Sequence, residues 1–276
     1  MPDALVARFP AVETRPQRPL IRIDGVGKVY QNGTVALADV DLAITQGEFV
    51  SLLGPSGCGK STLLRLIAGL GAVSGGTIDW PLSRYDSRGE PIRDLGFVFQ
   101  EPTLLPWATV ADNVYLPLKL AGVSRPDAAP RIEEALAMVK LMRFAGAYPR
   151  ELSGGMKMRV SIARALIVKP QVLLMDEPFA ALDEITRFRL NNDLLRLWQE
   201  QRWTVVFVTH SVFESVYLSS RIVVMSSRPG RIVGEIAVDA AYPRDDSFRT
   251  SRIYNEFCRL TSADLARAMA GAEDEE

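Results

Sequence analysis

A glycine-rich stretch near the N-terminus combines the residue types that bind phosphate. It reads Gly54-Pro55-Ser56-Gly57-Cys58-Gly59-Lys60-Ser61-Thr62 and fits the pattern G-x-x-x-x-G-K-[ST] in full. The glycines let backbone N–H groups turn inward, and these groups form an anion nest with the N-terminus of the following helix. Lys60 brings a positive charge to the β/γ oxygens, and the Ser61 hydroxyl can ligate Mg²⁺. The stretch predicts a nucleotide phosphate site; the alternative is a glycine-rich turn beside an unrelated lysine.

Two acids follow an apolar run in the second half of the chain. Val172-Leu173-Leu174-Met175 is typical of a buried parallel strand, and Asp176 and Glu177 come directly after it. The carboxyl ends of such strands face the crevice where α/β proteins bind ligands. Asp176 can hold Mg²⁺ through its water shell, and Glu177 points the other way, where it can polarise a water that attacks the γ-phosphate. The alternative is that these acids cap the next helix.

A second anion site is predicted at Ser153-Gly154-Gly155. A helix that begins with a serine cap and exposed N–H groups attracts negative charge. It cannot serve the phosphate that residues 54–61 already hold, so two such sites per chain predict a head-to-tail dimer. Each Ser153–Gly155 stretch would then close on the nucleotide of its partner. The alternative is an ordinary Ser-Gly-Gly helix start.

The elements that position these residues alternate between strand-like and helix-like stretches, which predicts an α/β fold. The expected strands are Leu20–Ile23, Ala36–Ile44, Glu48–Leu53, Gly96–Gln100, Gln171–Asp176, Thr204–Thr209 and Arg221–Ser226. The expected helices are Ser61–Gly69, Ala128–Leu141, Met156–Ile167 and Glu184–Gln201, with one or two more between Ser247 and Met269. Residues 101–165 show helices without convincing strands, which indicates a helical subdomain inserted into the α/β core.

Composition narrows the possible functions. The 276 residues have a formal net charge of −1, so there is no bulk positive field of the kind that binds nucleic acid. Two cysteines cannot build a disulfide framework. No apolar run is long enough for a transmembrane helix or a signal peptide, so any membrane role is expected to come through a partner. Residues 1–20 are expected to be a flexible lead-in, and 244–276 a helical extension with an acidic tail.

The stretch Leu152-Ser153-Gly154-Gly155-Met156-Lys157-Met158-Arg159 resembles the LSGGQ signature of the ATP-binding cassette (ABC) ATPases, with Met156 where glutamine is usual. The resemblance covers about Ile21–Pro243. It implies a P-loop NTPase core with a mixed sheet, an N-terminal antiparallel β subdomain and an inserted helical subdomain. It also implies that the cofactors are ATP and Mg²⁺.

Four further positions take their roles from this resemblance alone. Tyr30 corresponds to the aromatic residue that stacks on adenine. Gln100 corresponds to the glutamine that touches Mg²⁺ and starts the loop facing the membrane partner. Asp183 belongs to the loop that crosses between two cassettes, and His210, the only histidine in the chain, falls at the switch position near the γ-phosphate.

A closer resemblance is to the ATPases of nitrate, sulfonate and taurine importers. It is carried by residues 100–107, 152–159 and 178–187. It implies a homodimer of cassettes at the cytoplasmic face of the membrane, two transmembrane permease subunits and a periplasmic or extracellular solute-binding protein. The alternatives are an exporter ATPase, which Leu104-Leu105-Pro106-Trp107 disfavours, and a soluble ABC ATPase of DNA repair or translation. The single phosphate loop and the lack of a heptad tract disfavour the latter.

The cysteine inside the phosphate loop gives one more expectation. A helix N-terminus lowers the pKa of a thiol. Cys58 is therefore expected to react with maleimides and to be shielded by nucleotide.

Overall fold

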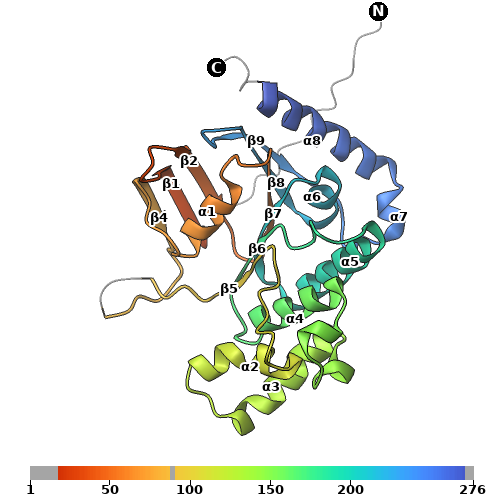
Figure 1. Ribbon diagram of the computed structural model, residues 1–276. Helices are drawn as coiled ribbons and strands as arrows, with labels where there is room; N and C mark the ends of the chain where they lie inside the picture. Colours follow the sequence, from red (N-terminus) through yellow and green to blue (C-terminus); the bar gives the residue numbers. More distant parts are fainter. Residues whose placement is uncertain (1–17, 88–90, 271–276) are drawn as a thin grey trace, which may run out of the picture.

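The computed structural model describes residues 18–87 and 91–270. Most of the expected lead-in and the acidic end of the expected tail lie outside these residues. A central sheet, a small second sheet and a lobe of helices make up the molecule (Figure 1). No helix in the described part of the chain is long and apolar enough to cross a membrane.

The central sheet has six strands in the order β5-β6-β7-β3-β8-β9. All neighbours pair in parallel except β8 and β9, which are antiparallel, so the sheet is mixed. The strands are β5 (Leu95–Val98), β6 (Val172–Asp176), β7 (Thr204–Thr209), β3 (Phe49–Leu53), β8 (Arg221–Met225) and β9 (Ile232–Ala237). Every residue of β3, β6 and β7 is buried, as expected of strands covered on both faces.

The second sheet is antiparallel and lies beside the first. Its order is β2-β1-β4, with β1 at Ile21–Val29, β2 at Val35–Ile44 and β4 at Gly75–Asp79. The sequence pattern does not predict β4, because its two glycines and exposed side chains weaken the strand signal. Nor does it predict β9, whose alternately half-buried and exposed residues form an edge strand.

Helix α1 (Lys60–Ile67) lies between the two sheets, while α5 (Glu184–Gln201), α6 (Val212–Leu218), α7 (Asp246–Arg249) and α8 (Arg252–Ala270) lie on the other side of the central sheet (Figure 1). Alternate residues of one strand therefore enter two hydrophobic cores. Phe49 and Leu53 of β3 pack with the second group of helices, and Val50 and Leu52 pack toward α1 and the small sheet.

The helical lobe is formed by residues that follow β5. It contains α2 (Val110–Leu120), α3 (Arg125–Met138), two short 3₁₀ turns (Met142–Phe144 and Pro149–Glu151) and α4 (Gly154–Leu166). Helix α3 begins earlier than its apolar periodicity predicts, because the Ser124 hydroxyl accepts the N–H of Asp127 and caps the helix. The two sheets and this lobe confirm the predicted fold class.

Candidate functional site

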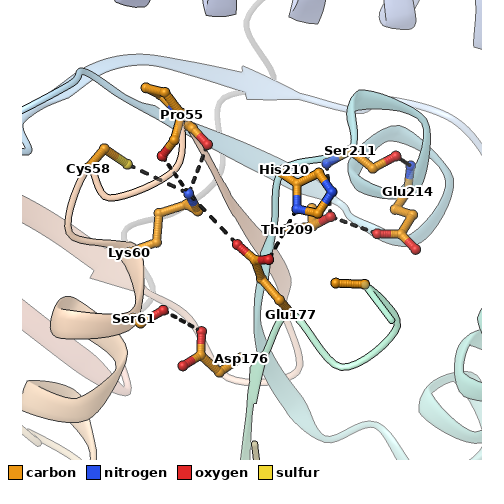
Figure 2. A network of polar contacts seen from close by, with 12 residues as sticks. Pro55, Cys58, Lys60, Ser61, Asp176, Glu177, Thr209, His210, Ser211 and Glu214 are labelled. Carbon is orange, nitrogen blue, oxygen red and sulfur yellow. Dashed lines mark hydrogen bonds and ion pairs between the residues drawn. The ribbon is translucent and has the colours of Figure 1, made fainter. Parts of the chain in front are cut away.

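The register of the central sheet brings the predicted site residues to one edge. Strand β7 lies between β3 and β6, with Leu53 beside Thr209 and Asp176 beside Val208. The phosphate loop follows β3, the acid pair ends β6, and His210 follows β7. Three segments far apart in the sequence therefore meet where parallel strands end, as Figure 2 shows.

Lys60 folds back over the phosphate loop. Its Nζ donates to the carbonyl oxygens of Gly54 and Pro55, both at 2.8 Å, and lies 4.0 Å from Glu177 Oε1 (Figure 2). The side chain is buried, with 3% of its surface exposed. A buried cation held mainly by two neutral carbonyls keeps most of its charge available to an anionic ligand.

The glycine of the cap, Gly59, is required by the space around it. It has φ 103° and caps α1 without any side-chain hydrogen bond. A Cβ at this position would lie 2.7 Å from the carbonyl oxygen of Ala36 and 2.7 Å from a methyl group of Leu37. The first N–H groups of α1 consequently stay free of side-chain caps, which suits an anion.

Ser61 and Asp176 form an oxygen pair next to this loop. Ser61 Oγ donates to Asp176 Oδ1 at 2.6 Å. Burial raises the pKa of Asp176, and this hydrogen bond opposes the rise. No cluster of three or more His, Cys, Asp or Glu side chains forms a metal site within residues 18–87 and 91–270. The pair suits Mg²⁺, since this ion prefers oxygen ligands, takes few from the protein and keeps several waters.

Glu177 and His210 are hydrogen-bonded to each other. His210 Nδ1 lies 3.1 Å from Glu177 Oε2, and an ionised carboxylate can only accept, so the ring donates from Nδ1. Glu177 has φ 44°, a backbone conformation uncommon outside glycine, and its N–H donates to Val208 O at 3.1 Å. That turn lets the two acids diverge, since Asp176 bonds Ser61 while Glu177 faces Lys60 and His210.

His210 is positioned by the start of α6. Thr209 Oγ1 donates to Glu214 Oε2 at 2.6 Å and accepts the N–H of Ser211 at 3.0 Å. Ser211 caps α6 by accepting the N–H of Glu214. The histidine thus lies between a buried strand end and a capped helix, which fixes the direction of its backbone.

A pocket of about 210 Å³ opens beside these groups. Tyr30 lies in its wall, with 43% of its surface exposed and its hydroxyl 3.1 Å from Thr62 Oγ1. Arg228 lies there too, although it belongs to no recognisable sequence motif. The residues of the wall that carry polar side chains are Tyr30, Thr34, Lys60, Ser61, Thr62, Glu177 and Arg228.

Three other predicted residues, Gln100, Asp183 and Ser153, do not line this pocket. Gln100 is exposed, two residues beyond β5, and forms no hydrogen bond within the described part of the chain. Asp183 caps α5 by accepting the N–H of Thr186 at 2.9 Å, which lowers the pKa of its carboxyl. Ser153 caps α4 through the N–H of Met156 at 3.3 Å, and Gly154 beside it is exposed. Their predicted roles concern a partner or a ligand and remain predictions.

The expectation for Cys58 is wrong. Its side chain is 1% exposed and packs in the core beneath the loop, with Sγ 2.8 Å from where a Cβ on Gly54 would lie. Burial raises the pKa of the thiol, against the lowering effect of Lys60. The helix N-terminus that the sequence revealed is therefore outweighed by desolvation, which it did not reveal.

The chain is similar to known proteins over most of its length. The pattern of the ABC transporter family matches residues 37–180. The chain belongs to this family. It is 44% identical over 239 residues to the aliphatic sulfonates import ATP-binding protein of Bacillus cereus, covering 86% of this chain and 92% of the relative. It is 44% identical over 256 residues to the nitrate import ATP-binding protein of a Synechocystis strain, covering 91% and 93%.

A solved structure supports the same assignment. The dimeric structure of a bacterial ABC transporter cassette superposes with a TM-score of 0.68 at 34% identity, over 80% of this chain and all of that one. A second structure of the same cassette is a post-hydrolysis state bound to ADP and Pi. This chain is accordingly an ATP-binding cassette, an ATPase coupled to transport.

Proposed function

We propose that this cassette is the energy-coupling subunit of an importer for nitrate, a sulfonate, taurine or a related small solute. The observation that carries the proposal is the meeting of Lys60, Glu177 and His210 at one sheet edge. Lys60 and the N–H groups of the loop hold the phosphates, and Tyr30 stacks on the adenine. Glu177 orients the water that attacks the γ-phosphate in line, while His210 holds the Glu177 carboxylate.

Mg²⁺ fits the oxygen pair of Ser61 and Asp176, with Gln100 as a third ligand in the nucleotide-bound state. When bound there, Mg²⁺ would supply positive charge that offsets the charge of the phosphates. Asp176 is suited to this task because its carboxylate is buried and its position is fixed by Ser61.

The hydrolytic site is completed by a second copy of the chain. Ser153–Gly155 of one cassette face the γ-phosphate held by the other, and Asp183 lies where the two chains cross. The exposed start of α4 supports this arrangement, because its first N–H groups can donate hydrogen bonds to an anion from outside the protomer. ATP binds the closed dimer better than the open one, and this difference in affinity moves the membrane partner.

The permease partners dock on the helical lobe beside Trp107. This side chain is 75% exposed, unusual for a large aromatic residue. Its loop is held firmly: Asn113 donates to three backbone carbonyl oxygens between residues 105 and 109, and Arg164 donates to those of Pro102 and Thr103. A fixed loop that presents an aromatic residue suits a partner helix. Two permease subunits, a solute-binding protein and a peripheral position at the cytoplasmic face follow from this role.

The test is reconstitution in membrane vesicles with candidate permease and solute-binding proteins from the same organism. We expect nitrate, taurine or another alkanesulfonate to stimulate ATP hydrolysis. Trp107→Ala should lose the stimulation, whereas Leu120→Ala, equally exposed on the same lobe, should keep it. Failure of the chain to associate with any permease would contradict the importer role, as would co-purification with nucleic acid.

A further inference from the structure

The turn between β8 and β9 holds the phosphate loop from outside. Its Gly230 exchanges two backbone hydrogen bonds with β2: its N–H donates to Ala36 O at 3.0 Å, and its carbonyl oxygen accepts the N–H of Ala38 at 3.1 Å. A Cβ on Gly230 would lie 2.1 Å from the carbonyl oxygen of Cys58, so only glycine allows this turn to pack on the loop. The turn, β2 and the phosphate loop therefore form one packed unit.

Arg228 extends from this turn to the loop. Its Nε donates to the carbonyl oxygen of Gly57 at 3.0 Å. This bond uses one of the five N–H donors of a guanidinium group, and the other four have no hydrogen-bond partner within residues 18–87 and 91–270. Arg228 also lines the pocket that contains Lys60, Ser61 and Tyr30.

The negative charge of a bound triphosphate would exceed the positive charge that Lys60 alone provides in this pocket. Lys60 supplies a single positive charge, and Glu177 places a negative charge 4.0 Å from its Nζ. A triphosphate carries several negative charges. A guanidinium group can form two parallel bonds to one phosphate, whereas an ammonium group acts as a point charge.

We propose that Arg228 binds the phosphate chain of the nucleotide directly, as the second cation of the pocket. The proposal rests on the assignment of this pocket to ATP. The bond to Gly57 fixes the guanidinium group at the mouth of the loop, so little side-chain freedom is lost when phosphate binds. An arginine 171 residues away in the sequence thus becomes part of the phosphate site.

The test is calorimetric titration of the full chain with ATP, ADP and adenosine. Arg228→Gln should weaken ATP binding about tenfold or more, the usual effect of losing a charge-assisted hydrogen bond. The loss should be smaller for ADP and absent for adenosine, and Arg228→Lys should lie between the wild type and Arg228→Gln. Arg231→Gln is the matched control, because Arg231 is an exposed arginine of the same turn outside the pocket wall, and its affinity should be unchanged.

The titrations distinguish failure of the role proposed for Arg228 from failure of the nucleotide site itself. Unchanged ATP affinity in Arg228→Gln, with affinity lost in Lys60→Ala, would overturn the role of Arg228 alone. Affinity kept in both variants would instead refute the pocket as the nucleotide site. An equal loss for ATP and adenosine, with a lower melting temperature, would show that Arg228 only shapes the loop, and would also overturn the proposal.

Discussion

The beginnings of helices α1 and α4 are both predicted anion sites, yet they are built differently. Helix α1 starts at a glycine with no side-chain cap, pressed between β2 and the β8–β9 turn and surrounded by Lys60 and Arg228. Helix α4 starts at Ser153, whose hydroxyl already accepts the N–H of Met156, and no cation lies in its first turn before Lys157.

The difference shows what each end can do alone. The start of α1 has N–H groups free of side-chain caps, two cations and a pocket, so we expect one chain to bind the phosphates of a nucleotide without its partner. The start of α4 has fewer free N–H groups and an open surface, so it is suited to add the last contacts to a phosphate that another chain already holds.

Gly154→Asp should distinguish the starts of α1 and α4 most strongly, because it should reduce hydrolysis and leave ATP affinity unchanged. In the proposed dimer, a negative charge at the start of α4 would repel the γ-phosphate that the partner holds, and we expect hydrolysis to fall on the order of 100-fold. ATP affinity of the single chain should not change, because residue 154 is outside its own pocket. The fold should survive, since a Cβ there meets only a methyl group of Leu182 at 3.4 Å. Steady-state hydrolysis and a binding titration measure both effects. A normal rate of ATP hydrolysis in Gly154→Asp would contradict the role proposed for the start of α4.

Asp176→Asn should have a smaller effect, which concerns the stability of the folded protein. Burial raises the pKa of Asp176 in the folded protein, so this carboxyl binds more protons folded than unfolded. Its contribution to stability therefore falls as pH rises from the unfolded pKa through the folded one. Without nucleotide or Mg²⁺, the melting temperature of Asp176→Asn at neutral pH should equal or exceed that of the wild type.

Asp183→Asn is the matched control, because the pKa of Asp183 is shifted in the opposite direction from that of Asp176. Hydrogen bonds from Thr186 lower the pKa of Asp183, so its stabilising effect is present above the unfolded pKa and is lost as pH falls through the folded one. Melting curves from pH 3 to 8 measure both variants. A clearly lower melting temperature for Asp176→Asn at pH 7 would contradict the desolvated carboxylate.

The smallest expected effect concerns Cys58, which maleimide should not label at all. Burial raises the pKa of this thiol and leaves it 1% exposed, so maleimide should not modify it with or without ATP. Cys258 should be equally inert, because burial raises its pKa to about 11. Gly154→Cys places a thiol on the exposed start of α4 and should react, as intact mass would show. Labelling of Cys58 that ATP prevents would mean that the α1 end is as open as the α4 end.

The sequence predicts the contiguous parts of this site well. The phosphate loop and the acid pair each follow a strand, and parallel strands end at one edge, so residues 54–62, Asp176 and Glu177 could be placed together. His210 was added to them by the family resemblance. The signature helix was also predictable, although it begins at Gly154 because Ser153 provides the cap.

Contacts between distant segments were not predictable in the same way. Arg228 meets Gly57 only because β8 pairs with β3 and its turn docks on β2. Cys58 lies in the same hydrophobic core as Met225 of β8, and Gly230 of the same turn packs against its carbonyl oxygen. No local pattern encodes either contact, so charge and desolvation at the loop emerge only from the packed fold.

The most direct test of the account is the ATP-dependent association of Glu177→Gln. Glutamine keeps an oxygen for the bond to His210 but cannot orient the attacking water, so hydrolysis should fall by about 100-fold or more. In sedimentation experiments with saturating ATP and Mg²⁺, we expect this variant to form a stable dimer, and the double variant Glu177→Gln/Gly154→Asp to remain a monomer with ATP bound. A Glu177→Gln chain that stays monomeric while saturated with ATP would contradict the claim that two chains complete each site.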